Sequence, residues 1–477
     1  MGARLLGLNS RLECIHESEG LHRGNGYPII GTSLKRGIVM DLRRFIAKSR
    51  SEGLLRVIRR PVSPRFELAN VAHALDGRPV LFESVKGYSQ WRVLAGPCSN
   101  RRHFSLALDV PPDRLLSRLA IAVENPQEAP WSETAPCQDV IESRVDLEKL
   151  PILHHLPQDA GAYVTSAVVI VKDPDLGRNM AYHRLLRLSS HEFAARLVEN
   201  RGTFKAWHKT EGDLPCAICI GLPLQVNLAA AIAPPPGVDE MGIAHALSPT
   251  PLVPCRTVDL AIPAETELVL EGRITKRLVA EGPFPDLTET MDVIRDQPVI
   301  EIDCITHRRE PIYHALLPGG LEHKLLMGMP REPTIFAEVN HIVRCTDVLI
   351  TAGGASWLHA VVQIEKGAPK DGHRAIEAAF RGHGSLKHVI VVDSDIDIHD
   401  PLQVEWAIAT RFQADRDLVL MLDQPGSSLD PSGVHVPGQK ARTAKMGLDA
   451  TIPWDRERVG FEKIHYMPVD LGEWQSE

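Results

Sequence analysis

Two acidic residues flank a Gly-Pro turn in the segment Glu281-Gly-Pro-Phe-Pro-Asp286. The two residues are five positions apart, and a tight turn between them can direct both carboxyl groups into one pocket. Acids that share a pocket tend to differ in protonation, so that one stays ionised beside a cation while the other carries a proton. The segment therefore suggests proton transfer to a reacting carbon, although an ordinary exposed turn has the same pattern.

A second group of polar residues begins with Asn179-Met-Ala-Tyr-His-Arg184 and continues with Arg196 and Arg201-Gly202. Three arginines at this spacing suggest an anion site, because a guanidinium binds phosphate or carboxylate through two parallel hydrogen bonds. A solvated basic face has the same composition. Glu240, which follows a Pro-rich turn, is either a ligand for a hard metal ion or a loop charge.

Several common catalytic signatures are absent from the sequence. It contains no phosphate loop, no dinucleotide fingerprint, no nucleophile elbow and no His-Glu-x-x-His zinc motif. Cys216 and Cys219 have CxxC spacing, but no second ligand pair follows, so we expect buried structural thiols. The acidic run from Asp393 to Asp397 lacks the Gly and Glu of a calcium loop, and we expect a solvated strand end.

The composition is typical of a globular protein with two or three cores: 477 residues, of which 44% are hydrophobic and 24% charged. The 61 acidic residues exceed the 53 basic ones and give a net charge of −8, which argues against a nucleic-acid partner. The apolar runs are far shorter than the roughly 20 residues of a membrane span, so we expect no membrane partner. The eight cysteines are scattered, which is typical of a cytoplasmic protein with reduced thiols.

The elements that must position these residues fall into three parts. From 40 to 150 the pattern predicts a small α/β layer, which begins with a helix capped by Asp41. From 151 to 310 short strands dominate, which predicts a β-barrel or a sandwich. From 311 to 455 strands alternate with helices, which predicts a mostly parallel α/β layer.

Both ends of the chain should lie outside these three parts. Residues 1–39 carry isolated apolar pairs without a secretory signal pattern, so we expect a loosely ordered N-terminal extension. Residues 456–477 should form a C-terminal tail.

The order and joint spacing of several motifs resemble the UbiD family of (de)carboxylases, which use prenylated FMN and a divalent metal. The resemblance extends from about Asp41 to Ile452, and the segment from His314 to Pro333 is most similar to an archaeal-type branch that includes anhydromevalonate phosphate decarboxylation. The motifs that carry it are DLRRFI from Asp41, N-x-x-Y-x-R from Asn179, PAxxExVLEG from Pro263, EGPFPD from Glu281, AIATRF from Ala407 and KMGLDAT from Lys445.

The resemblance implies an α/β fold of UbiD-like three-part architecture: an N-terminal α/β domain, a central split β-barrel for the flavin and a C-terminal α/β domain. It also implies a tail that is exchanged between subunits, and hence a homodimer or a higher homo-oligomer. Asn179 and Glu240 match the family's metal ligands, and a third ligand, often His in the family, aligns with Asn200. We expect manganese or another divalent metal there, and potassium as an optional further ion.

The resemblance also implies roles for the residues around the cofactor. Arg184 would bind the substrate carboxylate, Glu281 would orient Arg184, and Asp286 would finally protonate the carbon that loses CO2. The prenylated flavin would act as electron sink. The positions that match the lining of prenylated FMN are Tyr182, His183, Arg184, Arg196, Leu197, Val198, Arg201 and Gly202.

These matches predict a reversible, non-oxidative decarboxylase of an aromatic or α,β-unsaturated carboxylic acid, with a flavin prenyltransferase as cofactor supplier. One alternative is a trans-anhydromevalonate 5-phosphate decarboxylase of an isoprenoid pathway, and another is a non-catalytic flavin-binding subunit. The segment from Leu317 to Met327 should line the pocket, where Glu322, His323 and Lys324 could recognise a phosphate, a phenol or a second carboxylate. A phosphate would require two or more convergent cations.

Overall fold

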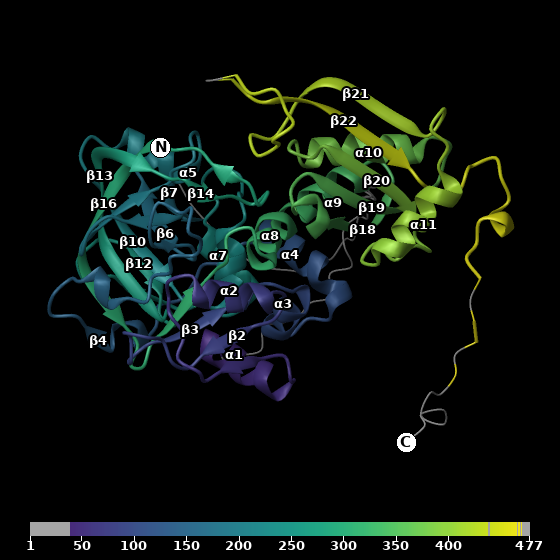
Figure 1. Cartoon of the computed structure of the whole chain (residues 1–477). Helices are drawn as coiled ribbons and strands as arrows, with labels where there is room; N and C mark the ends of the chain where they lie inside the picture. The colour runs from purple at the N-terminus through teal and green to yellow at the C-terminus, as the bar shows by residue number, and fades with distance from the viewer. Residues whose placement is uncertain (1–38, 437–438, 465, 468, 470–477) are drawn as a thin grey trace, which may run out of the picture. The chain divides into compact units, whose positions relative to one another are not determined.

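A computed structural model of the chain describes residues 39–436, 439–464, 466–467 and 469, and Figure 1 shows its helices and strands. The first helix, α1 (Leu42–Ser51), begins as predicted, because the Asp41 side chain accepts a hydrogen bond from the Arg44 amide. Residues 1–38 of the expected extension and 470–477 of the expected tail lie outside the described residues.

The first part of the chain builds a four-stranded sheet in the order β1-β2-β3-β17. β1 and β2 are parallel, β2 and β3 antiparallel, and β3 and β17 parallel. β17 comes from beyond residue 310, so this sheet is completed by a strand distant in sequence. The elements are β1 (Arg56–Ile58), β2 (Val80–Phe82), β3 (Arg92–Ala95), β17 (Ile312–Ala315), α2 (Glu67–Ala74), α3 (Arg101–Leu108) and α4 (Leu115–Glu124).

A nine-stranded sheet forms the central part of the fold. Eight strands follow the order β5-β8-β9-β16-β13-β10-β6-β7, β4 pairs with β16, and every pairing is antiparallel. The long strand β13 shifts register against β16 after Glu271 and after Ile274, which lets the sheet curl. The strands are β4 (Val140–Ile141), β5 (Tyr163–Val164), β6 (Val168–Asp173), β7 (Gly177–Tyr182), β8 (Leu185–Arg187), β9 (Glu192–Ala195), β10 (Leu214–Ile220), β13 (Leu268–Glu281) and β16 (Arg295–His307).

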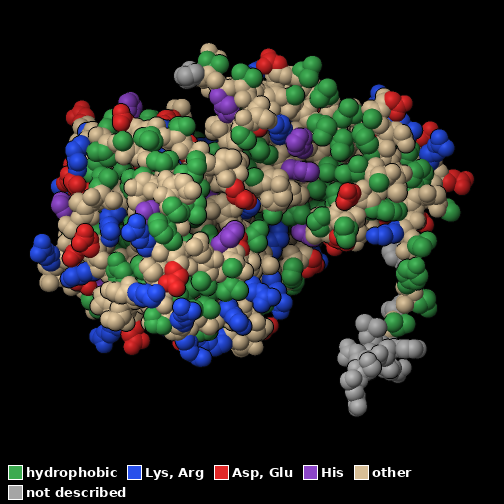
Figure 2. Space-filling view, in the orientation of Figure 1, with side chains coloured by type: hydrophobic (Ala, Val, Ile, Leu, Met, Phe, Trp, Pro, Cys, Tyr) green, Lys and Arg blue, Asp and Glu red, His purple; other side chains and the backbone are tan. Residues whose placement is uncertain are grey.

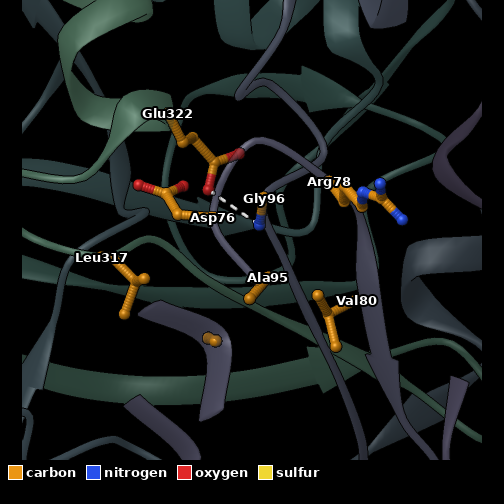
Figure 3. A pocket seen from close by; sticks show the side chains of 8 residues that line it. Asp76, Arg78, Val80, Ala95, Gly96, Leu317 and Glu322 are labelled. Atoms are coloured by element: carbon orange, nitrogen blue, oxygen red, sulfur yellow. Dashed lines mark hydrogen bonds between the residues drawn. The ribbon is translucent and has the colours of Figure 1, made fainter. Parts of the chain in front are cut away.

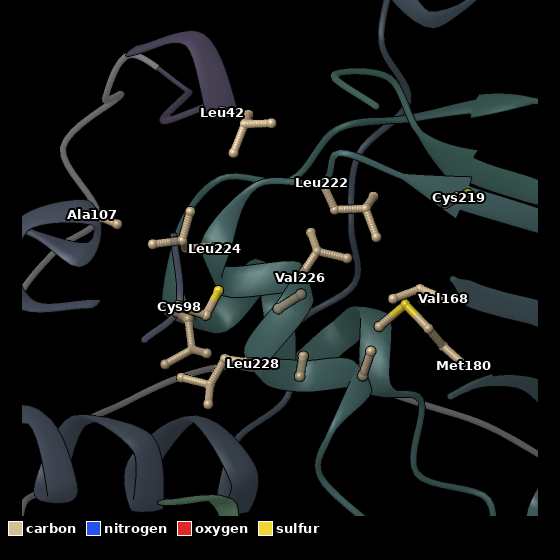
Figure 4. Packing of buried hydrophobic residues seen from close by; sticks show 14 of the residues in the cluster. Leu42, Cys98, Ala107, Val168, Met180, Cys219, Leu222, Leu224, Val226 and Leu228 are labelled. Atoms are coloured by element: carbon tan, nitrogen blue, oxygen red, sulfur yellow. The ribbon is translucent and has the colours of Figure 1, made fainter. Parts of the chain in front are cut away.

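The central sheet is buried on both faces. Along β10, Cys216 and Ile218 belong to one apolar cluster, and Ala217 and Cys219 to another. Figure 4 shows the second cluster, in which Cys219 lies with apolar side chains of α6 such as Val226. The two thiols therefore point to opposite faces, and both are free and buried, as expected. The remaining elements here are α5 (Gly202–Lys209), α6 (Leu224–Ala230), α7 (Glu240–Leu247), β11 (Leu252–Pro254), β12 (Ala261–Pro263), β14 (Phe284–Pro285) and β15 (Met291–Asp292).

The last part of the chain builds a five-stranded sheet in the order β18-β19-β20-β22-β21. The predicted mostly parallel layer is only partly right, because the central strands are parallel but β18 and β21 run antiparallel at the two edges. β18 reaches β19 through a short turn, which cannot provide the crossover that a parallel pair needs. The elements are β18 (Arg344–Ile350), β19 (His359–Glu365), β20 (His388–Asp393), β21 (Leu418–Pro425), β22 (Arg442–Asp449), α8 (Leu321–Gly328), α9 (Glu332–Asn340), α10 (Asp371–Gly382) and α11 (Pro401–Arg411).

The acidic run at the end of β20 is partly an ion-pair centre: the expected solvated strand end is wrong for Asp393, which is 4% exposed, whereas Asp395 and Asp397 are exposed. Asp393 and Asp395 pair with Arg411 of α11, with N···O distances of 3.2 and 2.6 Å. The Arg411 side chain is completely buried. This pairing depends on the packing of α11 against the sheet, which the acidic run alone does not reveal.

The surface carries charges of both signs. Figure 2 shows Lys and Arg side chains gathered over the N-terminal elements α1 to α3, with acidic side chains among them. Within the described part of the chain, no helix combines the length and the apolar character that a membrane crossing demands. Short 3-10 helices complete the secondary structure of the described residues: η1 (Pro112–Arg114), η2 (Pro136–Gln138), η3 (Leu147–Lys149), η4 (Met329–Arg331), η5 (Ala352–Gly354) and η6 (Arg458–Gly460).

Candidate active site

Arg184 and Glu281 form the centre of the candidate site. Arg184 lies between β7 and β8, and Glu281 is the last residue of β13. The Nε atom and one terminal nitrogen of Arg184 donate hydrogen bonds to the two carboxylate oxygens of Glu281, at 2.9 and 3.0 Å. Glu281 is completely buried and the Arg184 side chain is 13% exposed. The fold thus brings together two members of the predicted catalytic set.

Tyr163 and Asp292 complete this centre, and sequence reasoning missed both. The Tyr163 hydroxyl donates to Glu281 at 3.1 Å, and Asp292 accepts from Arg184 at 2.9 Å and from Arg295 at 2.7 Å. Burial opposes the charge of Arg184, but the hydrogen bond and charge of Glu281 outweigh burial and raise its pKa. Nη1 of Arg184 has no hydrogen-bond partner among the described residues, so this nitrogen is available to a substrate.

The turn that follows β13 shapes the other side of Arg184. Gly282 has φ +99°, a conformation that favours glycine, and a Cβ atom there would lie 3.2 Å from the Val293 carbonyl oxygen. The turn leads to Phe284, whose ring centroid lies 5.5 Å from the Arg184 guanidinium carbon and 4.1 Å from the Tyr163 ring centroid. Carboxylates therefore hold the edges of the guanidinium, and an aromatic ring lies against it.

Asp286 directly follows β14, in the loop that joins β14 to β15 in a hairpin, and it is half-buried. One carboxylate oxygen accepts from the Leu287 amide at 2.6 Å, and the Asp286 amide donates to the Thr290 carbonyl at 3.0 Å. Among the described residues, nothing hydrogen-bonds its other carboxylate oxygen. The proton-donor role of Asp286 stays a prediction.

His323 of α8 lies near this hairpin and contacts it through Gly319. Its Nδ1 atom accepts from the Gly319 amide at 3.1 Å, and a Cβ atom on Gly319 would lie 3.4 Å from the Asp286 carbonyl oxygen. Burial lowers the pKa of His323, and the charges of Asp286 and Arg184 act on it in opposite directions. Because Nδ1 is an acceptor, neutral His323 carries its proton on Nε2.

Glu322 and Lys324, the two neighbours of His323, already interact with other residues of the chain. Glu322 is buried, accepts from backbone amides of the β3–α3 loop at 2.8 and 3.2 Å and contacts His314 Nε2 at 3.0 Å. Figure 3 shows Glu322 beside Gly96, at a cavity of about 10 Å³ that has room for about one water molecule. Lys324 forms an ion pair with Glu289. Of the three expected recognition residues, only His323 remains free to recognise a ligand.

Asn179 and Glu240, the predicted metal ligands, lie next to each other. Glu240 begins α7 and accepts a hydrogen bond from the Met180 amide at 3.1 Å. Burial raises the pKa of Glu240 to about 7, and it outweighs the opposing effects of two backbone hydrogen bonds and of the Arg178 charge. Hard divalent ions prefer oxygen ligands of this kind. The described residues contain no cluster of three or more His, Cys, Asp or Glu able to hold a metal, and the ligand role of Asn179 and Glu240 stays a prediction.

Hydrogen bonds fix the orientation of the Asn179 amide. His183 Nδ1 donates to the Arg196 carbonyl at 2.9 Å, so its Nε2 accepts from the Thr203 hydroxyl at 2.9 Å. The Thr203 oxygen in turn accepts from Asn179 Nδ2 at 3.1 Å. The Asn179 amide oxygen then faces Gly202, where a Cβ atom would lie only 1.9 Å away. The amide is therefore oriented with its oxygen available as a ligand.

The other residues expected around a flavin are spread over the edge of the sheet. Tyr182 donates to Asn227 at 2.8 Å, and Leu197 is buried with its amide bound to the Gln297 side chain at 2.7 Å. Val198 is 47% exposed, which makes it an apolar surface available for a planar ring.

The three arginines of the sequence pattern do not converge on one anion. Arg196 pairs with Glu199 at 3.2 Å, and Arg201 is exposed at the start of α5, whereas Arg184 is held by Glu281. Asn200 is exposed at φ +65°, and within the described residues it makes no hydrogen bond with Asn179 or Glu240. A third metal ligand therefore stays unassigned.

Comparison with known proteins shows the family. Three models of the 3-octaprenyl-4-hydroxybenzoate carboxy-lyase (UbiD) family match the chain: the N-terminal domain at residues 46–123, the Rift-related domain at 130–321 and the C-terminal domain at 324–450. The chain belongs to the UbiD family of carboxy-lyases.

Among curated relatives, the anhydromevalonate phosphate decarboxylase of Methanosarcina mazei is 42% identical over 417 residues, which cover 86% of this chain and 96% of the relative. The corresponding enzyme of Methanothermobacter thermautotrophicus is 39% identical over 86% of this chain and 97% of its own length. These relatives are decarboxylases, so the activity class is that of a carboxy-lyase and the non-catalytic subunit is set aside.

Solved structures confirm the expected three-part fold class. The UbiD-class enzyme HmfF from Pelotomaculum thermopropionicum in complex with FMN superposes with a TM-score of 0.86 at 38% identity, covering 91% of this chain and all of that one. The apo 3,4-dihydroxybenzoic acid decarboxylase of Enterobacter cloacae has a TM-score of 0.84 at 28% identity, covering 92% and 99%.

Proposed function

We propose that this carboxy-lyase catalyses the non-oxidative decarboxylation, reversible in principle, of an α,β-unsaturated or aromatic carboxylic acid. The observation that carries this proposal is the Arg184–Glu281 pair, which is bidentate, largely buried and followed in the chain by the hairpin whose loop begins with Asp286. Such a centre offers one fixed cation for a carboxylate and one acid for the product carbon.

Each residue would have a distinct task. Nη1 of Arg184 would hold the substrate carboxylate, while Glu281 and Asp292 keep the guanidinium in place through their hydrogen bonds. Tyr163 would keep the Glu281 carboxylate oriented. Prenylated FMN would supply the electron sink for the departure of CO2. Asp286 would then deliver a proton to the product carbon.

Asn179 and Glu240 would hold the divalent metal, with manganese as our choice and potassium as an optional further ion. The oriented Asn179 amide oxygen and the buried Glu240 carboxylate support this assignment. The flavin would lie against Tyr182, His183, Arg184, Arg196, Leu197, Val198, Arg201 and Gly202. The FMN complex of HmfF, a structural relative, supports a flavin cofactor.

A phosphorylated acid is the second candidate within this class of substrate. Relatives that act on anhydromevalonate phosphate are 42% and 39% identical to this chain, whereas the 3,4-dihydroxybenzoic acid decarboxylase is 28% identical. The relatives therefore favour trans-anhydromevalonate 5-phosphate over an aromatic acid.

The proposal includes a cytoplasmic homodimer or higher homo-oligomer that receives its cofactor from a flavin prenyltransferase. The seven described cysteines are all free, which agrees with a reducing compartment. On the edge strand β21, Leu420 and Leu422 are 56% and 67% exposed, and apolar side chains of this kind are suited to a subunit contact.

Co-expression with a flavin prenyltransferase tests the function. The purified protein should carry a modified flavin and a stoichiometric divalent metal, and it should release CO2 from either trans-anhydromevalonate 5-phosphate or an aromatic acid. A Glu240→Gln variant should lose the metal, whereas Asp239→Asn, which alters the neighbouring helix cap, should keep it. A parent protein that stays colourless and metal-free with all partners supplied would contradict the proposal.

A further inference from the structure

The guanidinium of Arg331, the last residue of η4 directly after α8, has no counter-ion. Its Nε atom is buried without a hydrogen-bond partner, and among the described residues no carboxylate lies within ion-pair distance of it. The adjacent acid, Glu332, is already engaged by Arg101 and by the Ile350 amide at 3.0 Å. A largely buried, unpaired cation is costly, unless an anion binds there in the working enzyme.

The neighbours of Arg331 are aromatic or basic. The Trp357 ring centroid lies 5.6 Å from the guanidinium carbon, and the His383 ring packs edge-on against Trp357 with centroids 4.4 Å apart. His383 is 7% exposed, and its Nε2 atom is buried without a partner. Arg331 and His383 therefore present unused hydrogen-bonding groups around one ring.

The electrostatic balance of this cluster is positive. Burial and the nearby charge of Arg201 lower the pKa of Arg331 to about 10, so the side chain keeps its charge at neutral pH. Burial and the charge of Arg331 lower the pKa of His383 to about 3. A bound dianion would reverse both effects, because it would offset the charges of Arg331 and Arg201.

The cluster lies at the far end of the helix that begins beside the catalytic hairpin. His323, near the start of α8, bonds to Gly319, which lies against the Asp286 carbonyl. Arg331 follows His323 by five positions along α8 and three along η4, which corresponds to about 13 Å at rises of about 1.5 and 2.0 Å per residue. A small extended molecule could therefore have its carboxylate near Arg184 and an anionic group at Arg331.

We propose that Arg331 and His383 bind a phosphate group at the end of the substrate opposite to its reacting carboxylate. This inference rests on the proposed decarboxylase function and deepens it, because it selects a phosphorylated acid over an unsubstituted aromatic one. A phosphate offers three acceptor oxygens and can take two parallel hydrogen bonds from a guanidinium. An aromatic acid with no second anionic group would leave Arg331 unpaired.

The flavin also carries a phosphate, so the experiment must distinguish a substrate phosphate at Arg331 from the flavin phosphate. The probes are 5-phosphonopentanoate, which has a phosphonate at one end and a carboxylate at the other, and pentanoate, which lacks the phosphonate. Each is titrated calorimetrically into the flavin-loaded protein and into its Arg331→Met and Arg331→Lys variants. Flavin content and flavin dissociation constants are measured on the same samples.

We expect Arg331→Met to weaken 5-phosphonopentanoate binding by roughly 10- to 100-fold, with pentanoate and flavin binding unchanged. Arg331→Lys keeps the positive charge but loses the two parallel hydrogen-bond donors of the guanidinium. Its affinity for 5-phosphonopentanoate should therefore lie between those of Arg331→Met and the parent protein. The matched control is Arg381→Met, because Arg381 is half-exposed on α10 and pairs with Glu338 at 3.5 Å. This control should bind both probes like the parent protein.

Two results would overturn the proposal. If Arg331→Lys and Arg331→Met bind 5-phosphonopentanoate as tightly as the parent, no anion site exists at Arg331. If they lose flavin instead, the site serves the flavin phosphate and not the substrate. Because binding is measured without turnover, a parent protein that binds the phosphonate through Arg331 but releases no CO2 would count against the decarboxylase function alone.

Discussion

Arg184 and Glu281 lie 97 residues apart in the chain and are joined by two parallel hydrogen bonds of 2.9 and 3.0 Å. Glu281 also accepts from Tyr163, and Arg184 also donates to Asp292. The guanidinium is thus fixed on two edges, and only Nη1 is left for a ligand. This arrangement makes the position of Arg184 insensitive to small movements of the substrate.

Arg184→Lys tests the fixed guanidinium. An ammonium group cannot bridge both Glu281 oxygens and reach Asp292 at the same time, so we expect kcat/KM to fall by roughly 10²-fold or more with the flavin still bound. The control is Arg187→Lys on the adjacent strand β8, which should change kcat/KM little. Similar kinetics for Arg184→Lys and the parent would show that the bidentate geometry is dispensable.

Gly202→Ala tests the proposed metal and flavin site without replacing any of its polar side chains. The new Cβ atom would lie 1.9 Å from the Asn179 amide oxygen, so the amide must turn or the loop must shift. We expect a folded protein that has lost most of its metal, measured by elemental analysis, and much of its flavin, measured by absorbance. Gly212→Ala is the matched control, because no atom lies within 4 Å of its Cβ position; normal metal content in both variants would refute this view of Asn179.

Arg411→Met should be the most destabilising of the substitutions discussed. It would leave the buried Asp393 carboxylate without its cation, at a cost of about 3–5 kcal/mol in the free energy of unfolding. The exposed pair of Arg416 and Asp417 offers a control, and Arg416→Met should cost less than about 1 kcal/mol. Denaturant titration measures both, and equal effects would show that Arg411 contributes no more than a surface charge.

Stability should fall steeply on acidification, because five histidines with strongly lowered pKa values stay neutral in the folded chain. Burial lowers the pKa of His103, His183 and His359 to about 4 and that of His155 and His383 to about 3. Below about pH 6.5 the unfolded chain binds protons at these residues and the folded chain does not, so the free energy of unfolding decreases as pH falls from 6.5 towards 4.

The free energy of unfolding should fall by about 1.4 kcal/mol per proton and pH unit, or by at most about 7 kcal/mol per pH unit for five protons. Melting temperatures between pH 7.5 and 5 measure it, and His359→Phe should make the decline less steep. His191→Gln, at an exposed position, should leave the decline unchanged. A melting temperature that is constant from pH 7 to 5 would contradict the prediction.

Local signals predicted the parts of the site that lie close together in sequence. Asp41 is the N-cap of α1, and the acids of the Glu281–Asp286 segment do belong to one turn and hairpin. In contrast, Tyr163 reaches Glu281 across 118 residues, and no spacing rule connects them. Asp292 could have been suggested by the hairpin, since it lies opposite Phe284 in the β14–β15 pairing.

Other features depend on packing that no local pattern contains. The sequence does not predict the direction in which the polar residues of α8 point. Glu322 points into the interior, where two backbone amides and His314 form hydrogen bonds with its carboxylate. The first sheet includes β17, which follows all the strands of the central sheet in the chain and pairs in parallel with β3. The unpaired state of Arg331 is likewise visible only once its neighbours are placed.

In the proposed reaction, Asp286 delivers the proton that replaces CO2. Asp286→Asn keeps the volume and the polarity of the side chain and can still accept from the Leu287 amide. It removes the acid, so ligand binding should survive while turnover falls by roughly 10²-fold or more, the usual scale for the loss of a general acid.

The most direct measurement follows decarboxylation and solvent-deuterium exchange at the product carbon in Asp286→Asn, with flavin content held at the parent level. We expect both rates to fall together by roughly 10²-fold or more, while the dissociation constant of the product stays within a few-fold of the parent value. Unchanged rates for both reactions would contradict this expectation and make Glu281 the next candidate for the proton donor.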